Sequence, residues 1–489
     1  MGRIMDFRHQ ISLPGNLSSL PADALLLVLA GDAVDASLDT KLASALNDAL
    51  AQGDFKLKSG RTLYLHRPAG VKAPRVLASA SGGNDVKAFK SAVLQGLNQL
   101  KGLGAQHVAV AFVGGELDDQ HAEAAVTAAA DAVYLYRHTK PSAPPASGLN
   151  KLTVVCSKAK AKAVQAGLLR GEAISAGVTL ARECANRPGN HCTPTYLADQ
   201  AKKLGKSHQL KVEVLDHKDV EKLGMGSFLA VAQGSSEPLR FIVARYEGAP
   251  KSQAPVVLVG KGITFDTGGI SIKPSAEMDE MKYDMGGAAS VLGTLRAIAE
   301  LKPKINLIGI IPSCENMPDG KAVKPGDVVT SMSGQTIEIL NTDAEGRLIL
   351  CDALTYAERF KPAVVVDIAT LTGACVVALG HHNSGLFSPD DALAAELLAA
   401  SQASLDPAWR MPLDDEYAEG IKSNFADVAN VGSRAGGAIT AALFLKRFTG
   451  KYRWAHLDVA GTAWKSGAAK GSTGRPVPLL THFVLSQVR

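Results

Sequence analysis

The sequence predicts an α/β protein of two domains: a smaller N-terminal α/β domain and a larger C-terminal α/β domain with a mixed sheet flanked by helices. Three observations lead to this fold class. The 489 residues exceed what one ordinary hydrophobic core contains. Short apolar runs, typical of buried strands, alternate with helical patterns along the chain. One long alanine-rich helical pattern separates two such regions.

The N-terminal domain is expected over residues 1–157. Apolar runs predict its buried strands, and patterns with helical spacing predict the helices between them. The predicted strands are 24–31, 75–80, 107–114, 132–137 and 151–157, and the predicted helices are 87–100 and 118–132. This alternation is typical of a sheet covered by helices.

A connecting helix is expected over residues 158–187. Its pattern is continuous and ends before Pro188 and Gly189, because proline and glycine terminate helices. The C-terminal domain then covers residues 188–489. Its predicted strands include 241–247, 255–260, 305–312, 363–370 and 455–461.

The composition predicts a soluble cytoplasmic protein without a membrane partner. Hydrophobic residues make up 46% of the chain and charged residues 20%, the balance of a globular protein. No apolar run approaches the roughly 18 residues of a membrane span, and the first residues lack the apolar core of a secretory signal. The six cysteines form no CxxC pair, which favours reduced thiols over a zinc knuckle or a disulfide framework.

Three segments of the C-terminal domain carry charged residues beside predicted strands and helices. The first, KGITFDTGGISIK (261–273), begins where a strand ends, which is where open α/β sheets bind ligands. The second, MDEMKYDMGG (278–287), precedes a helical pattern, and the third, NTDAEGRL (341–348), lies between a strand and a helix. Their candidate functional residues are Lys261, Asp266, Lys273, Asp284, Asp343, Glu345 and Arg347.

The carboxylates of these segments suggest a metal site if they converge. Taken singly, an acidic residue before a helix is usually a cap with favourable charge. Four carboxylates brought together would mostly protonate, whereas two divalent cations would neutralise them. The set is rich in oxygen and contains no histidine, so it suits Mn²⁺ or Mg²⁺ and can hold Zn²⁺. Paired metals of this kind can hold a hydroxide at neutral pH and clamp a reacting oxygen.

These segments resemble those of the leucyl aminopeptidases of the cytosol aminopeptidase family, bacterial type. NTDAEGRL agrees with that family's signature octapeptide at every position. KGITFDTGGISIK, MKYDMGGAAS, ENMPDGKAVKPGD and ATLTGA follow the family's order and spacing, and the likeness continues through HHNSGLFS to HLDVAG. The N-terminal domain is similar in layout only. The resemblance implies a metal-dependent aminopeptidase that releases a broad range of N-terminal residues from peptides and prefers leucine among them.

The resemblance also implies a ligand set for two divalent metals, Mn²⁺ or Zn²⁺. One metal would be bound by Lys261, Asp266, Asp284 and Glu345, and the other by Asp266, Asp343 and Glu345. The lysine would have to be neutral, which an adjacent cation can enforce by displacing its proton. The free α-amine of the substrate would bind the first metal, which explains cleavage from the N-terminus.

Two basic residues would be catalytic, as the resemblance implies. Lys273 would polarise the scissile carbonyl and stabilise the oxyanion, and Arg347 would hold a bicarbonate ion that relays a proton. The residues implied to contact substrate are Lys261, Asp266, Lys273, Asp284 and Asp343, together with the pocket residues Met281, Thr370, Gly373 and Ala460. The resemblance further implies a homohexamer.

The sequence also bears on functions other than that of a peptidase. Phe265 stands where a dinucleotide-binding loop needs its third glycine, and no GxSxG or HExxH motif occurs. A two-metal phosphoesterase stays open, although it would need basic residues beyond Lys273 and Arg347. Some bacterial family members also bind DNA in transcription or recombination. Residues 1–187 carry 21 Lys and Arg against 15 Asp and Glu, an excess of +6 that is too small to indicate nucleic acid.

Overall fold

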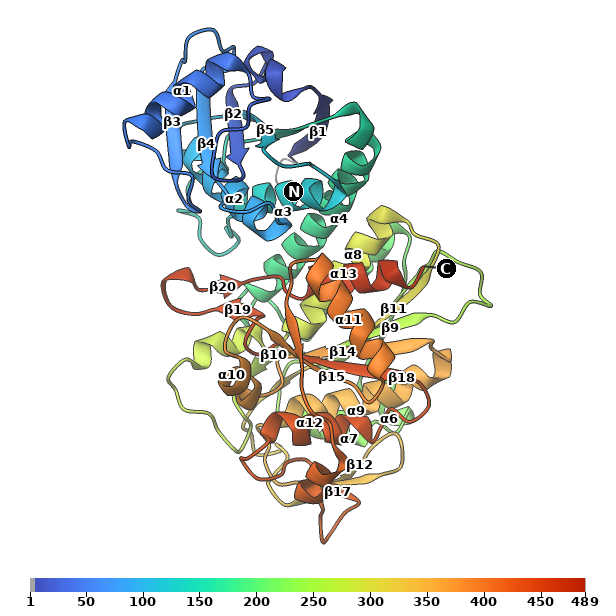
Figure 1. Cartoon of the computed structure of the whole chain (residues 1–489). Coiled ribbons are helices and arrows are strands. Elements are labelled where there is room, and N and C mark those ends of the chain that lie inside the picture. The colour runs from blue at the N-terminus through green and yellow to red at the C-terminus, as the bar shows by residue number, and fades with distance from the viewer. Residues whose placement is uncertain (1–4, 489) are drawn as a thin grey trace. The chain divides into compact units, whose positions relative to one another are not determined.

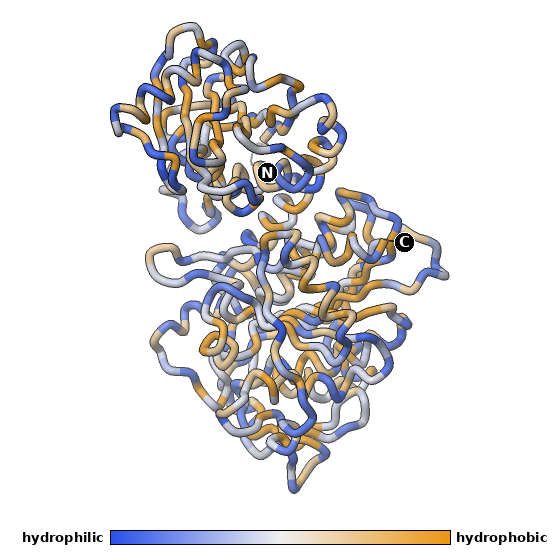
Figure 2. Tube along the Cα trace, viewed as in Figure 1, coloured by the Kyte–Doolittle hydropathy of each residue, from blue (hydrophilic) through white to orange (hydrophobic). Residues whose placement is uncertain are grey.

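A computed structural model describes residues 5–488, which form two compact α/β units, as predicted (Figure 1). One unit ends at Ser175 and the other begins at Ala176. Hydrophobic stretches run through the interior of each unit, and hydrophilic stretches gather in the outer loops (Figure 2). Within the described residues, no helix has both the length and the apolar character that crossing a membrane requires.

The N-terminal unit is a six-stranded sheet between two layers of helix. Its strands are β1 (Asp6–Ile11), β2 (Ala24–Leu29), β3 (Thr62–His66), β4 (Arg75–Ala80), β5 (His107–Val113) and β6 (Lys151–Cys156), in the order β1-β6-β5-β2-β4-β3. All neighbouring strands are parallel except β3 and β4. Helices α2 (Val86–Gly102) and α3 (Asp119–Val133) cover one face, whereas α1 (Thr40–Ala51) and the 3-10 helix η1 (Pro14–Ser19) cover the other.

One predicted strand of this unit, 132–137, is wrong. Helix α3 continues to Val133, and Tyr134 closes it by donating its N–H to the Ala130 carbonyl. A short apolar run does not distinguish a strand from a helix end, so periodicity alone misled here. The strand β1, which was not predicted, pairs with β6 at the edge of the sheet, and its mixed polar and apolar residues gave no clear pattern.

The predicted connecting helix forms as one long helix. After the 3-10 turn η2 (Lys158–Lys160), α4 runs over Ala161–Ala185. The division between the units falls inside it. Val164 and Leu168 pack in a core of the N-terminal unit, and Ala181 and Cys184 pack in a core of the C-terminal unit.

The C-terminal unit contains a nine-stranded mixed sheet, which confirms the predicted strands of this part. The strands are β7 (Lys211–Leu215), β8 (Arg240–Glu247), β9 (Val256–Gly260), β10 (Gly262–Asp266), β11 (Asn306–Asn316), β14 (Val364–Ala369), β15 (Ser384–Phe387), β16 (Ala408–Arg410) and β18 (Arg453–Asp458). Their order is β16-β15-β18-β14-β9-β11-β8-β7, with β10 beside β11. The central strands β18, β14, β9, β11 and β10 are parallel, whereas β15, β8 and β7 pair antiparallel to their inner neighbours.

Helices cover both faces of this sheet. One face carries α5 (Pro194–His208), α8 (Gly286–Leu301), α11 (Asp391–Ala403) and α13 (Val477–Ser486), and the other α7 (Gly226–Ala232), α9 (Glu345–Ala357) and α12 (Gly437–Lys446). Successive side chains of β9 alternate between the two cores: Val256 and Leu258 enter one, Val257 and Val259 the other. Because both faces are buried, such strands are continuously apolar, which made them predictable.

Short elements complete the C-terminal unit. They are α6 (His217–Lys222), α10 (Gly373–Leu379), β12 (Asp327–Thr330), β13 (Thr336–Ile339), β17 (Val428–Ala429), β19 (Trp464–Lys465), β20 (Gly471–Ser472), η3 (Met278–Tyr283), η4 (Glu358–Phe360), η5 (Asp415–Ile421) and η6 (Gly467–Ala469).

Candidate active site

The carboxyl ends of the central parallel strands bring the predicted residues to one edge of the sheet. Lys261 directly follows β9, Asp266 ends β10, and Thr370 directly follows β14. Two residues that the sequence did not single out, Asn316 and Asp458, end β11 and β18 at the same edge. This is the edge at which open α/β sheets bind ligands.

Two helix starts complete the cluster. Asp284 lies between η3 and α8, Asp343 lies in the loop after β13, and Glu345 is the first residue of α9. Steric crowding explains the glycine in NTDAEGRL. A Cβ on Gly346 would lie 2.6 Å from Cε of Lys261. Any larger residue at this position would therefore displace the Lys261 side chain from its carboxylate partners.

Lys261 joins two carboxylates from different segments. Its Nζ lies 2.8 Å from Asp284 Oδ2 and 2.7 Å from Glu345 Oε1, and it donates to the Thr370 carbonyl at 3.0 Å. Burial alone lowers the pKa of Lys261, but its carboxylate neighbours, Asp284 first, outweigh burial and raise this pKa. The Thr370 hydroxyl donates to Asp284 Oδ1 at 2.6 Å, which ties the loop after β14 to the same pair.

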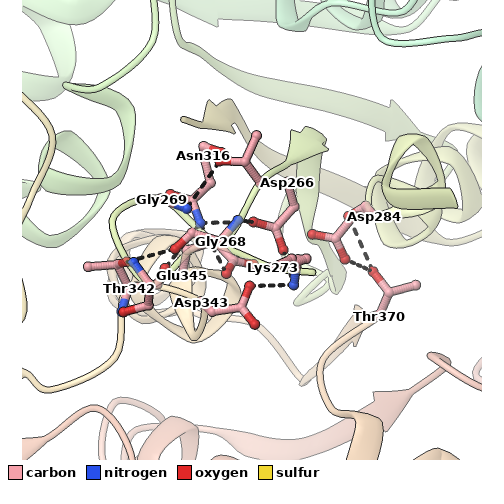
Figure 3. A network of polar contacts seen from close by, with 12 residues as sticks. Asp266, Gly268, Gly269, Lys273, Asp284, Asn316, Thr342, Asp343, Glu345 and Thr370 are labelled. Carbon is pink, nitrogen blue, oxygen red and sulfur yellow. Dashed lines mark hydrogen bonds and ion pairs between the residues drawn. The ribbon is translucent and has the colours of Figure 1, made fainter. Parts of the chain in front are cut away.

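Asp266 is the centre of a second set of contacts, shown in Figure 3. Its Oδ1 accepts from Asn316 Nδ2 at 2.8 Å and from the N–H of Gly268 at 2.9 Å. Its Oδ2 lies 2.8 Å from Lys273 Nζ, and Lys273 also pairs with Asp343. Both lysines of the site thus bridge pairs of carboxylates.

The charges of the cluster do not balance. Burial raises the pKa of Asp284 and of Asp343, and burial followed by repulsion from Glu345 raises the pKa of Asp266 to about 6. For Glu345, burial is outweighed by Lys261 and Lys273, which lower its pKa. Four carboxylates therefore face two ammonium groups, and the crowding makes ionisation of three of them unfavourable.

The carboxylate groups fit a divalent cation. Oxygens of Asp266, Asp343 and Glu345 lie within 4.8 Å of one another, and the carboxyl groups of Asp266 and Glu345 are almost fully buried. Hard oxygen donors of this kind suit Mn²⁺ or Mg²⁺ and can accommodate Zn²⁺. A cation between Asp284 and Glu345 would compete with the Lys261 ammonium, so Lys261 could join the ligands only as the neutral amine.

Arg347 lies apart from these direct contacts, two residues after Glu345 in the first turn of α9. Its side chain is buried, and Nη1 donates to the Asn430 carbonyl at 2.7 Å. Its Nε has no hydrogen-bond partner among the residues described. Burial lowers the pKa of Arg347 to about 10, although Glu345 and Asp458 oppose this shift. A buried guanidinium with an unused donor is suited to binding a small anion.

The predicted pocket residues come from different segments. Met281 lies on η3, Thr370 follows β14, Gly373 begins α10, and Ala460 follows β18. Their membership of one pocket stays a prediction.

Asp458 connects the last three of these segments. It accepts from the N–H of Leu371 at 3.2 Å, the hydroxyl of Thr372 at 2.7 Å and the N–H of Ala460 at 3.1 Å. Asp458 and Asn316 are the site residues that sequence reasoning missed. The signal available for both was a polar residue at the end of an apolar strand.

A buried edge of a parallel sheet that gathers four carboxylates and two lysines defines a metal-dependent hydrolase. The catalytic-domain profile of the cytosol aminopeptidase family matches residues 179–481, and the family's N-terminal-domain profile matches residues 26–142. The chain therefore belongs to the cytosol aminopeptidase family, and the protein is an aminopeptidase.

Individual relatives resemble the whole chain. The probable cytosol aminopeptidase of Methylibium petroleiphilum is 71% identical over 485 residues, 99% of this chain and 100% of the relative. That of a Polaromonas species is 57% identical over 491 residues, 99% of this chain and 95% of the relative. A mutant of tomato leucine aminopeptidase has a similar structure, with a TM-score of 0.89 at 34% identity over 100% of this chain and 97% of that one. The structure of Bottromycin maturation enzyme BotP in complex with Mn is also similar, with a TM-score of 0.84 at 33% identity. The match covers 96% of this chain and 100% of that one.

Proposed function

We propose that this aminopeptidase releases a broad range of N-terminal residues from peptides and prefers leucine among them. It would use two divalent ions, Mn²⁺ or Zn²⁺. The observation that carries the proposal is the cluster of the buried Asp266 and Glu345 with the half-buried Asp343, joined through Lys261 to Asp284. The solved relatives support it, since one is a leucine aminopeptidase and the other was determined in complex with Mn.

Each residue of the cluster has a distinct task in this proposal. The cation ligands would be Lys261, Asp266, Asp284, Asp343 and Glu345. When bound, the cations would supply the positive charge that activates water and polarises the reacting carbonyl. Lys273, whose side chain is 20% exposed, would donate from Nζ to that carbonyl oxygen as negative charge develops there. The side-chain pocket would be formed by Met281, Thr370, Gly373 and Ala460.

Blocking the amino group of the substrate is expected to remove most of the activity. The proposed enzyme recognises a free amine through the cluster, and an acetylated nitrogen is a far poorer donor to a cation. Loss of a contact to a charged group costs about 1.5–3 kcal/mol, which corresponds to roughly 10–150-fold in kcat/KM. The measurement compares leucyl-peptides with acetyl-leucyl-peptides on the metal-loaded enzyme.

Two further substrates make this test decisive. Leucyl-p-nitroanilide should be hydrolysed, and p-nitrophenyl phosphate should not. Equal cleavage of free and acetylated peptides would contradict recognition of the amine, and hydrolysis of the phosphate ester alone would favour a phosphoesterase.

Arg347 is proposed to be the residue that would hold a bicarbonate ion, which when bound would supply a general base for the reaction. In degassed buffer, added bicarbonate should raise kcat of the wild type. Arg347→Ala should lose this response and retain a rate lower by about 10²-fold, since assistance by a general base is typically worth at least that much. Arg447→Ala is a control, because Arg447 donates only to the exposed side chain of Gln335 in the contacts described. An unchanged bicarbonate response in Arg347→Ala would refute the role given to this residue.

We also propose that the protein assembles as a homohexamer in the cytoplasm. The relatives named as cytosol aminopeptidases support this location. Light scattering of the purified protein tests the assembly, and a monomer at working concentration would contradict it.

A further inference from the structure

A buried carboxylate outside the metal cluster connects two walls of the predicted substrate pocket. Glu280 lies on η3, one residue before Met281, and only 4% of it is exposed. Its partners are on the β19–β20 hairpin, far along the chain, where β19 and β20 pair antiparallel. Trp464 Nε1 donates to Glu280 Oε2 at 2.9 Å, and the Ser466 hydroxyl donates to the same oxygen at 2.6 Å.

The contact is reinforced by a charge and by ring stacking. Lys470 Nζ lies 3.1 Å from Glu280 Oε1. The ring of Tyr283, the last residue of η3, stacks on the Trp464 indole with centroids 5.7 Å apart and planes at 14°. Both oxygens of the Glu280 carboxylate thus contact one hairpin. These contacts couple the position of η3 to that of the hairpin.

The two tied segments carry residues of the proposed site. Met281 and Asp284 follow Glu280 within four residues, and Ala460 precedes Trp464 by four. Met281 and Ala460 are predicted to line the side-chain pocket, and Asp284 contacts Lys261 at 2.8 Å. Because Lys261 and Thr370 hold Asp284 separately, a shift of η3 against the hairpin would change the width of the pocket before it moved this carboxylate.

We infer that Glu280 is a positioning residue that sets the substrate side-chain preference by holding η3 against the β19–β20 hairpin. This inference rests on the proposed aminopeptidase function. The contacts described for Glu280 are to Trp464, Ser466 and Lys470, and none of them is a proposed cation ligand. Removing its buried carboxylate leaves the half-buried Trp464 Nε1 without its acceptor, and a donor shielded from water is costly to leave unpaired, whereas the exposed Ser466 hydroxyl can turn to water. The helix and the hairpin should then separate, and the pocket should fit leucine less closely.

The neighbouring carboxylate provides a matched control. Asp279 also pairs with Lys470, at 2.8 Å, but it is exposed on the outer side of η3. Exposed ion pairs contribute little to stability. Asp279→Ala therefore removes a similar charge from the same helix without removing the buried contact.

The experiment compares leucyl and alanyl substrates in Glu280→Ala, Asp279→Ala and the wild type, with metal content measured in each. Glu280→Ala should lower the ratio of kcat/KM for leucyl over alanyl substrates by at least about tenfold, a change of the size expected when a hydrophobic pocket loses its fit. The loss should appear mainly in KM, and Asp279→Ala should keep the wild-type ratio. Metal content should be unchanged in both variants.

A milder variant keeps the inference testable if Glu280→Ala does not fold. Trp464→Phe removes only the Nε1 donor and retains an aromatic ring for Tyr283, so it should lower the same ratio to a smaller extent. An unchanged ratio in Trp464→Phe and in any folded Glu280→Ala would overturn the inference. Wild-type protein that hydrolyses neither substrate would instead overturn the proposed function, so the two failures are distinct.

Discussion

Glu345→Ala is expected to abolish aminopeptidase activity, with kcat lowered by about 10³-fold or more and with loss of bound metal. Glu345 is buried at the start of α9, its Oε1 lies 2.7 Å from Lys261 Nζ, and its carboxyl group belongs to the cluster with Asp266 and Asp343. The loss of a single electrostatic contact at a reacting centre already costs about 10²–10³ in kcat. A residue proposed to contact both cations should cost more. Steady-state kinetics and metal analysis of the purified variant measure both effects.

The fold should survive this substitution, although stability should fall. Breaking a buried ion pair typically costs about 3–5 kcal/mol, but Lys261 keeps its second partner, Asp284. Glu345→Gln keeps the side-chain volume and should also lose metal, and Asp343→Ala should follow the same course. Circular dichroism and thermal unfolding check that each variant is folded.

A carboxylate directly after the other end of α9, at the start of η4, serves as the control. Glu358 pairs with Lys451 at 2.7 Å on the surface, and Glu358→Ala should keep both activity and metal. Near-wild-type turnover with full metal content in folded Glu345→Ala or Asp343→Ala would exclude the proposed metal site at that position.

The candidate site could be predicted largely because strand ends are visible in sequence. Continuous apolar runs such as 255–260 and 363–370 predict strands buried on both faces, and these strands formed. Polar residues directly after such runs must lie at the carboxyl edge of a parallel sheet. Lys261, Asp266 and Lys273 follow from that rule, because their segment begins where the strand 255–260 ends, whereas Thr370 was indicated only by the family resemblance.

The residues that were missed differ from these in their local signal. Asn316 and Asp458 also end strands, but a single amide or carboxylate after an apolar run is usually an ordinary loop residue. Only the three-dimensional contacts distinguish them. Asn316 donates a hydrogen bond to Asp266, and Asp458 accepts one from the N–H of Leu371. Glu280 gave still less signal, because its partners lie 184 residues or more away in sequence.

Lys273→Ala is expected to lower kcat by about 10²–10³-fold while the metal content stays near that of the wild type. Lys273 is proposed to stabilise negative charge on the substrate carbonyl oxygen, and the loss of one preorganised donor typically has this cost. Its Nζ bridges Asp266, at 2.8 Å, and Asp343, and the side chain is partly exposed, as a group that meets substrate must be. Burial alone would lower its pKa, but Asp266 and the other carboxylates raise it, so the ammonium form persists at neutral pH. The measurement is kcat with and without bicarbonate.

The bicarbonate titration separates the two basic residues of the site. Added bicarbonate should not restore Lys273→Ala, because the missing group acts directly on the carbonyl, whereas Arg347→Ala should be insensitive to the anion itself. Lys273→Met retains the apolar stem and removes only the charge, so it should lose as much activity as Lys273→Ala. If Lys273→Met kept most of the wild-type kcat, packing of the stem and not its ammonium group would be what the reaction needs. If metal were lost together with activity, Lys273 would serve the cluster of Asp266 and Asp343 and not the substrate.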